Sequence, residues 1–308
     1  MSFSIDVKNE ITRLDHSNLE NVALLSAYIR QNAYIGHDLI RIHTENAAIC
    51  RYLFKMIKSL YDVTSKITVR KNFNFKKTFI YIMEVKDKKD FILKDLSLLN
   101  DMGYFINIPK EYIVGDDELK KAYLRGCFLA SGSINNPKTS RYHLEFLLDD
   151  FEYATFISDI LNEYELNSRV IKRQNGYMVY IKEAERISDF LKIIKAYSGV
   201  LYFENVRIYR DQKNITNRLN NCEQANIEKT INTALKQIDD INTISNMIGL
   251  DALDDKLQEV ANFRLKYPES SLLELSTIMS HELSKSVTKS GLNHRFRKIK
   301  EMADKMRG

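Results

Sequence analysis

Several residue types and segments that would define a protein class are scarce in this sequence of 308 residues. It has three cysteines, Cys50, Cys127 and Cys222, which lie far apart and form no CxxC or Cys/His pair at metal-binding spacing. This pattern argues against both a disulfide framework and a zinc site. Only three prolines and ten glycines are present, so long disordered linkers are not expected.

Long apolar segments are also missing. No apolar run approaches the roughly 18 residues that a membrane-spanning helix needs. Residues 1–20 are polar and charged and do not have the pattern of a signal peptide. We therefore expect a protein of the reducing cytoplasm, with no membrane partner.

The charge is small overall but unevenly distributed. Hydrophobic residues make up 44% of the chain and charged residues 28%, and the net charge is +5. Residues 211–282 contain seven Lys/Arg and twelve Asp/Glu, whereas residues 283–308 contain eight and two. A basic C-terminal segment after an acidic one suggests an anionic partner, of which nucleic acid is the commonest.

Two segments rich in small residues, 25–33 and 124–132, share one size pattern and lie 99 residues apart. Ala27 corresponds to Gly126 and Ala33 to Gly132. Small residues on one helical face let another helix approach closely. We therefore expect the two helices to pack against each other at the centre of a duplicated structure.

The same order of elements, helix–strand–helix–strand–strand–helix, follows in each copy. The first copy predicts helices over 19–31, 47–60 and 91–99 and strands over 39–44, 66–71 and 78–85, with a polar turn at 72–77. The second predicts helices over 118–131, 149–161 and 187–197 and strands over 142–148, 168–172 and 177–181. The expected fold is α+β, with two αβαββα halves, 1–110 and 111–210, in a monomer with an internal pseudo-two-fold axis.

Beyond the duplicated region the pattern becomes helical. A last strand-like piece is expected over 200–211. A long helix over 215–241 then forms a connecting segment, 211–245. The remainder, 246–308, predicts helices over 254–266, 272–279 and 284–306, with a connector at 280–283.

The last two helices have helix-turn-helix organisation. Six cations and no acid occur between Lys285 and Lys300. Asn, Arg and Lys can bond base edges, and Ser, Thr and Lys can bond phosphates. The alternative is an ordinary three-helix bundle with a basic surface. The candidate DNA-binding residues are Lys285, Ser286, Thr288, Lys289, Ser290, Asn293, His294, Arg295, Arg297 and Lys298.

The paired helices resemble the LAGLIDADG motif of homing endonucleases, in which the last acidic residue of each motif binds the metal that cleaves DNA. Here those positions hold Asn32 and Ser131, and the earlier acidic positions hold Arg30 and Leu129. An amide and a hydroxyl are poor ligands for Mg²⁺. The resemblance therefore implies that the fold is kept and the chemistry lost, with no metal, no cofactor and no catalytic residue. We expect Arg125, on the second helix, to be structural, and Tyr123 and Cys127 to be core residues.

Four further stretches are informative: Thr44-Glu45-Asn46-Ala47-Ala48, the segment 123–133, Asn217-Arg218 with 221–226 and Lys229-Thr230, and Ser284-Lys285-Ser286 with 290–299. Through these stretches the whole chain resembles the WhiA family of bacterial DNA-binding regulators. The family's serine-lysine-serine-glycine run is split here, and Lys289-Ser290-Gly291, running into Leu292, is its better match.

This resemblance implies a transcription factor that binds duplex DNA through the helix-turn-helix, with the duplicated domain as a regulatory or partner-binding body. The family is tied to sporulation in actinobacteria and to cell division and chromosome segregation in other Gram-positive bacteria. A nucleoid location and a further partner among transcription or division proteins are implied as well. Two alternatives remain open, a scaffold for nucleoid or division proteins with secondary DNA binding, and a metal-dependent nuclease.

Overall fold

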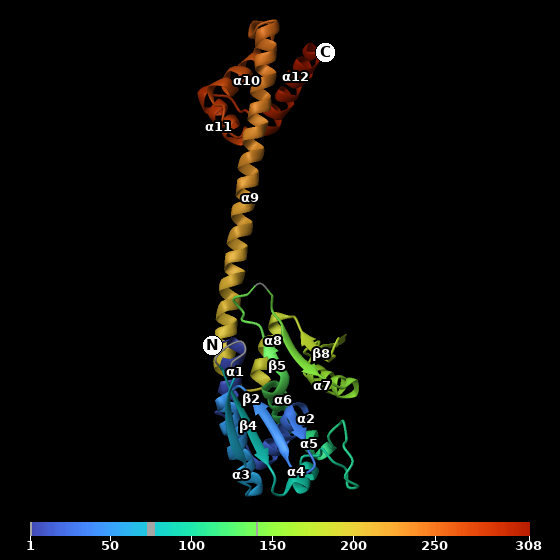
Figure 1. The fold of residues 1–308 in the computed structure, drawn as a ribbon. Coiled ribbons are helices and arrows are strands. Elements are labelled where there is room, and N and C mark those ends of the chain that lie inside the picture. Colours follow the sequence, from blue (N-terminus) through green and yellow to red (C-terminus); the bar gives the residue numbers. More distant parts are fainter. Residues whose placement is uncertain (1, 73–77, 140) are drawn as a thin grey trace. The chain divides into compact units, whose positions relative to one another are not determined.

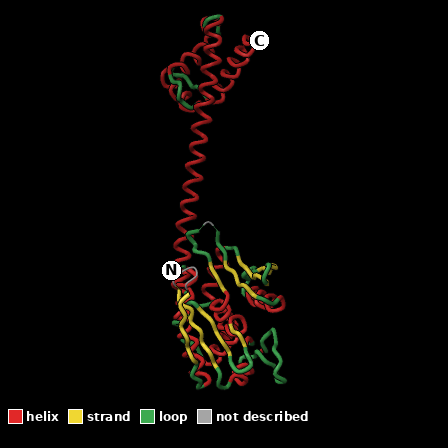
Figure 2. The backbone as a smooth tube through the Cα atoms, viewed as in Figure 1, coloured by secondary structure: helices red, strands yellow, loops and turns green. Residues whose placement is uncertain are grey.

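A computed structural model describes residues 2–72, 78–139 and 141–308. The chain divides into two compact units, Met1–Arg210 and Asp211–Gly308 (Figure 1). All strands of the described residues belong to the first unit, and the second unit is helical (Figure 2). Each unit has its own cluster of buried apolar side chains.

The first unit contains two successive copies of one arrangement. The first copy consists of α1 (Phe3–Ile11), α2 (Asn18–Asn32), β1 (Ala33–Ile35), β2 (Ile40–Thr44), α3 (Ala47–Tyr61), β3 (Lys66–Asn72), β4 (Thr78–Val85) and α4 (Lys89–Asp95). The second consists of α5 (Glu111–Val114), α6 (Asp117–Ser131), β5 (Gly132–Ile134), β6 (Leu144–Leu148), α7 (Phe151–Glu163), β7 (Arg169–Arg173), β8 (Gly176–Ile181) and α8 (Ala184–Ile193). The duplicated α+β fold is therefore confirmed.

Two equivalent antiparallel sheets result. Their strand orders are β1-β2-β4-β3 and β5-β6-β8-β7. In the central pairs, Ile42 is opposite Met83 in the first sheet and Phe146 is opposite Val179 in the second. The side chains of Ile42, Met83, Phe146 and Val179 are buried, so both registers place apolar residues in the core.

The two small-residue helices, α2 and α6, pack against each other along their length. A Cβ atom on Gly126 of α6 would lie 2.2 Å from the carbonyl oxygen of Leu24 and 2.8 Å from Cβ of Ala27 in α2. Ser17 and Glu20 form a capping box at the start of α2, and Asp116 caps α6 through the backbone N–H of Leu119. The predicted close approach of the two helices is confirmed.

Two predictions about the first unit need correction, and a third lies largely outside the described residues. The short edge strands β1 and β5 were not predicted, because each has three residues and follows its helix without a break. The helix expected over 91–99 ends at Asp95. The turn expected at 72–77 lies, from residue 73 onward, outside the described residues.

The strand-like piece expected over 200–211 is wrong. These residues lie in α9, a helix of 51 residues from Tyr197 to Met247. The helix expected over 187–197 is α8, which ends at Ile193, and Gly199 lies inside α9. Glu10 of α1 accepts hydrogen bonds from the backbone N–H groups of Ser198 and Gly199, at 2.7 and 3.0 Å, and so caps the start of α9.

The second unit contains the C-terminal part of α9 and four shorter helical elements. They are η1 (Leu250–Ala252), α10 (Asp255–Lys266), α11 (Leu272–Glu282) and α12 (Lys289–Arg307). Ile241 and Ile244 of α9 share one buried cluster with Val260, Leu275 and Ile299. The end of α9 is therefore part of this unit's core.

Candidate nucleic-acid interface

Helices α11 and α12 and the turn between them form the helix-turn-helix. Ser271 and Glu274 make a capping box at the start of α11, as their spacing predicts. Helix α11 continues through the expected connector to Glu282. Thr288 caps α12 by accepting a hydrogen bond from the backbone N–H of Gly291 at 3.1 Å.

The last helix therefore begins at Lys289 and not at residue 284. Ser284 has a φ of 50°, a left-handed conformation that is incompatible with continuing a helix. The hydroxyl of Ser280 accepts a hydrogen bond from the backbone N–H of Val287 at 2.9 Å and fixes the turn against α11. Lys285, Ser286 and Thr288 thus lie in the turn, and the later start agrees with the Lys289-Ser290-Gly291 alternative.

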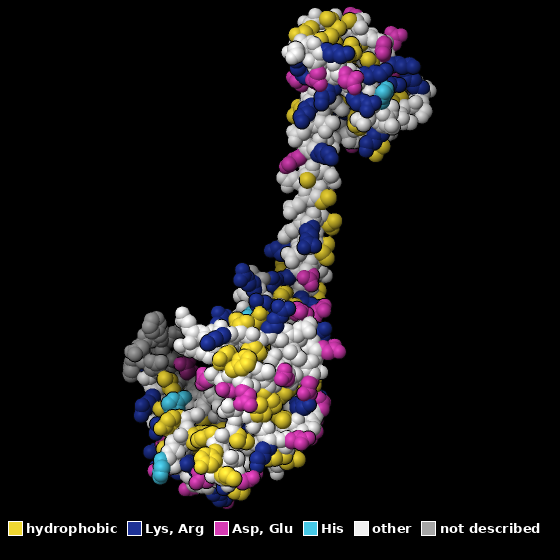
Figure 3. All heavy atoms as spheres, turned by 90° about the vertical axis from the view of Figure 1, so that its right-hand side faces the viewer, with side chains coloured by type: hydrophobic (Ala, Val, Ile, Leu, Met, Phe, Trp, Pro, Cys, Tyr) yellow, Lys and Arg dark blue, Asp and Glu magenta, His cyan; other side chains and the backbone are white. Residues whose placement is uncertain are grey.

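Most candidate residues on α12 share its exposed side. Lys289, Ser290, Asn293, His294, Arg297 and Lys298 are all exposed. The opposite side packs into the core through Leu292, Phe296 and Ile299. In Figure 3, Lys and Arg side chains gather on the face of this unit that the view shows. Acidic residues appear on α12 only from Glu301 onward.

Two candidates depart from the expected exposed, free arrangement. Arg295 is half-buried, and within the described part of the chain its Nη1 atom has no hydrogen-bond partner. Lys285 is exposed, but its ammonium contacts both carboxylate oxygens of Glu259 in α10 at 2.8 Å. The charge of Lys285 is therefore already paired within the unit.

His294 and Arg297 interact along the exposed side. Nη2 of Arg297 donates a hydrogen bond to Nδ1 of His294 at 3.0 Å. This arrangement requires Nδ1 of His294 to be unprotonated, so the proton of a neutral ring lies on Nε2. The contact orients the Arg297 guanidinium and leaves its other N–H groups for a second acceptor.

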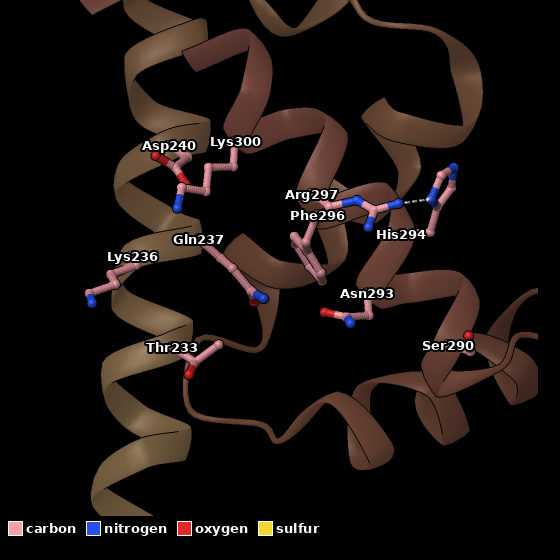
Figure 4. Close-up of a pocket in the computed structure, with 10 residues that line it drawn as sticks. All are labelled: Thr233, Lys236, Gln237, Asp240, Ser290, Asn293, His294, Phe296, Arg297 and Lys300. Carbon is pink, nitrogen blue, oxygen red and sulfur yellow. Dashed lines mark hydrogen bonds between the residues drawn. The ribbon is translucent and has the colours of Figure 1, made fainter. Parts of the chain in front are cut away.

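A groove of about 460 Å³ runs between α9 and this side of α12 (Figure 4). Its lining on α9 was not anticipated from the sequence. The one available signal was the spacing of Lys229, Thr233 and Lys236, which puts all three on one helical face. The lining residues are Thr233, Lys236, Gln237, Asp240, Ser290, Asn293, His294, Phe296, Arg297 and Lys300.

The positions that carry the metal-binding acids in homing endonucleases form a neutral polar seam in the first unit. The Asn32 amide donates to the carbonyl oxygen of Ala130 at 3.4 Å, and the Ser131 hydroxyl donates to Oε1 of Gln31 at 2.5 Å. Gln31 in turn donates to the Tyr153 hydroxyl at 2.9 Å. These hydrogen bonds connect α2 with α6 and, through Tyr153, with α7. Within the described ranges, no group of three His, Cys, Asp or Glu side chains is placed to hold a metal ion.

The earlier motif positions are also structural. Arg30 donates hydrogen bonds to the backbone carbonyl oxygens of Ser97, Ile106 and Asn107. Leu129 is buried in the core of the first unit. Tyr123 and Cys127 are buried as expected, and burial raises the pKa of the Cys127 thiol to about 12.

Arg125 has the structural role that the sequence predicted for it. It is completely buried and contacts Glu20 of α2 across the helix pair, with Nη2 2.9 Å from Oε1. Burial lowers the pKa of the Arg125 guanidinium. Burial would by itself raise the pKa of Glu20, but the hydrogen bonds from Ser17 and the charge of Arg125 hold it below its usual value.

None of the described helices has the length and apolar character needed to cross a bilayer.

Comparison with known protein families matches the two halves of the first unit and the helical second unit separately. Residues 19–99 match the family described as WhiA N-terminal LAGLIDADG-like domain. Residues 120–213 match the WhiA LAGLIDADG-like domain, and residues 216–303 match the WhiA C-terminal HTH domain.

Similar full-length proteins are found among curated relatives and solved structures. A "probable cell division protein WhiA" of Staphylococcus saprophyticus is 44% identical over 311 residues, which cover all of this chain and 98% of the relative. Its counterpart in Staphylococcus aureus is 43% identical with the same coverage. The crystal structure of full-length WhiA from Thermotoga maritima superposes with a TM-score of 0.61 at 26% identity, covering 99% of each chain.

Proposed function

The chain belongs to the WhiA family, and from that premise we propose that it is a non-catalytic, sequence-specific DNA-binding protein that regulates transcription. One observation carries the proposal. The first three turns of α12 combine exposed Lys289, Asn293, Arg297 and Lys298 with a buried opposite side and no acidic residue. A recognition helix uses its N-terminal turns to contact base edges, and α12 has that distribution.

The exposed side chains suit both kinds of DNA contact. Asn293 can bond adenine bidentately, and Arg297 can bond guanine in the same way. Lys289, Ser290 and Lys298 suit phosphate oxygens. Among the sequence candidates, Ser286, Thr288 and His294 remain proposed contacts, whereas Lys285 and Arg295 contribute only if they leave their present environments.

The biological setting is proposed from the relatives. Those from staphylococci are named as probable cell division proteins, and we propose a role in cell division for this chain, with chromosome segregation added from the sequence resemblance. Sporulation is proposed only where the host forms spores. We further propose a monomer in the cytoplasm, associated with the nucleoid, that acts with a transcription or division protein.

Binding of the full chain to promoter fragments tests the proposal. Fluorescence anisotropy at several salt concentrations should give an affinity that falls linearly on a log–log scale. Preference for one fragment over unrelated DNA supports sequence-specific regulation, and absence of salt-dependent binding refutes it. Mapping of chromosomal occupancy together with transcripts separates a regulator from a scaffold, because a scaffold occupies DNA without changing transcript levels.

Nuclease activity is not part of the proposal. Asn32 and Ser131 cannot provide the paired carboxylates that metal-assisted phosphodiester hydrolysis requires. Incubation of the full chain with plasmid DNA and Mg²⁺ or Mn²⁺ should leave the plasmid intact. Cleavage that persists after further purification contradicts the non-catalytic assignment.

A further inference from the structure

The groove beside α12 continues into a second hollow of about 390 Å³. Lys229, Thr230 and Thr233 of α9 line the second hollow together with Lys289 of α12, and Thr233 lines both. One wall is therefore the α9 face that carries Lys229, Thr233 and Lys236. The other wall is the α12 side that contains the proposed base-reading residues.

The charge of this groove is positive. Lys236 of α9 lines the first hollow together with Arg297 and Lys300 of α12, and Lys229 lines the second together with Lys289. Asp240 is the one carboxylate among the lining residues, and Nη1 of Arg307 contacts it at 2.7 Å. A narrow space with cations on both walls attracts a polyanion that can lie along it.

Gln237 of α9 adds an observation that charge alone does not explain. It is 8% exposed and lines the groove, and its Oε1 atom has no hydrogen-bond partner among the residues that the structure describes. Buried polar groups normally have partners. Figure 4 shows Gln237 and Asn293 pointing toward each other across the groove, whereas Lys236 lies at its outer edge and points away from α12.

We propose that this groove holds a stretch of the sugar–phosphate backbone of the duplex whose base edges α12 reads. The Gln237 amide and the Thr233 hydroxyl donate to phosphate oxygens inside the groove, and Lys229 and Lys236 neutralise phosphates at its edge. An amide has donor and acceptor ends of the same shape, so rotation of Gln237 presents its NH₂ group. Contacts of this kind fix the register of a recognition helix on DNA.

The inference rests on the proposed DNA-binding function and assigns part of that function to α9. It gives α9 a role in binding in addition to its role in connecting the two units. Because phosphate contacts carry no base information, α9 and α12 should affect binding differently. Removal of α9 contacts should weaken binding to all sequences, whereas removal of α12 contacts should also reduce sequence discrimination.

The first test is the full-length double variant Lys229→Ala/Lys236→Ala. We expect affinity to fall about tenfold or more on specific and unrelated DNA alike, and the log–log salt slope to decrease in magnitude by about 2. Lys256→Ala/Lys305→Ala is the matched control, because it removes two exposed cations of the same unit outside the groove. Wild-type affinity of the groove variant, or an equal loss in the control, overturns the inference.

The second test changes the DNA and measures the wild-type chain as well as one variant. Single phosphates flanking the binding site are replaced by neutral methylphosphonates, and binding of the wild-type chain is compared with that of Gln237→Glu. At the phosphate held in the groove, neutralisation should weaken wild-type binding but strengthen binding of the variant, because it removes the repulsion between the new carboxylate and that phosphate. If no phosphate couples to Gln237, the groove assignment is wrong, while discrimination lost in Arg297→Ala still supports the proposed function. If the wild-type chain binds no DNA, both proposals fail.

Discussion

The guanidinium of Arg125 in α6 contacts the carboxylate of Glu20 in α2 at 2.9 Å, and the two residues are 105 positions apart in the chain. The Arg125 side chain is fully buried, and that of Glu20 is 15% exposed. His16 lies on the same carboxylate, with Nδ1 3.7 Å from Oε1. This ion pair joins the two duplicated halves at the helix pair on which the first unit is built.

Loss of one charge of this pair should be costly. Glu20→Gln keeps the capping box, because glutamine serves at that position, but leaves Arg125 buried without a counter-ion. We expect the free energy of unfolding to fall by about 3–5 kcal/mol in urea denaturation. Glu282→Gln removes the exposed ion pair with Lys266 and should change the free energy of unfolding far less, because solvent screens exposed charges.

A double variant distinguishes the effect of the unpaired buried charge from the effect of side-chain packing. The double variant Glu20→Gln/Arg125→Met replaces the pair by a neutral side chain and an apolar one. It should be more stable than Glu20→Gln alone, since no uncompensated charge remains. A double variant that is as unstable as the sum of the single variants shows that the charges do not interact.

The close approach of the two helices gives a prediction at Gly126. In Gly126→Ala the new Cβ would meet the Leu24 carbonyl oxygen at 2.2 Å, and backbone cannot move away as a side-chain end can. We expect a loss of about 3 kcal/mol or more in unfolding free energy. Ala27→Gly should not restore stability in the double variant, because it removes only the contact at 2.8 Å. Full recovery of stability in the double variant would show that the new Cβ clashes with the Ala27 side chain and not with the Leu24 backbone.

Features that depend on local pattern could be predicted from the sequence, and features that depend on distant partners could not. The size pattern of 25–33 and 124–132 predicted the helix pair correctly. The start of α9 was missed because Glu10, about 190 residues earlier in the chain, caps it. A segment with Val206, Ile208 and Tyr209 suggested a strand locally, but it lies in α9, where Ile208 and Tyr209 are exposed.

The candidate interface likewise has features set by local sequence pattern and features set by distant residues. The exposed face of α12 follows from the spacing of Leu292, Phe296 and Ile299, which was visible in the sequence. The pairing of Lys285 with Glu259 depends on how α10 packs, and no local signal carries it. The groove was missed for the same reason, since Gln237 reaches α12 only because the end of α9 joins the core of the second unit.

The free energy of unfolding should vary with pH because His16 takes up a proton less readily in the folded chain than in the unfolded chain. Burial, and after it the charge of Arg125, lowers the pKa of His16 to about 4 from an ordinary value near 6.5. The unfolded chain therefore takes up the proton first as the pH falls. The stabilisation from a neutral His16 is complete above pH 6.5 and is lost between pH 6.5 and about 4, by up to about 1.4 kcal/mol per pH unit.

Urea unfolding between pH 4.5 and 7 measures this slope. His16→Asn should flatten it, because no group at that position then titrates in the window. His37→Asn is the matched control, since the His37 side chain is 98% exposed and should leave the slope unchanged. An unaltered slope in His16→Asn assigns the pH dependence to other groups.

The last prediction concerns which side chains of α12 contact bases and which contact phosphates. Arg297→Ala should weaken binding to the preferred promoter fragment by about 1–3 kcal/mol, and weaken binding to unrelated DNA much less, because a bidentate base contact is lost. Lys298→Ala should weaken binding to both kinds of DNA to a similar extent and reduce the salt slope by about 1, as expected for a phosphate contact.

The His294→Ala variant distinguishes a direct base contact of Arg297 from an indirect effect on its orientation. Loss of the His294 ring removes the hydrogen bond of 3.0 Å to Arg297, so sequence discrimination should fall partly. The charge of Arg297 is retained, so the salt slope should stay the same. Equal effects of Arg297→Ala on all sequences would instead place Arg297 on the backbone and leave Asn293 as the residue to test for base recognition.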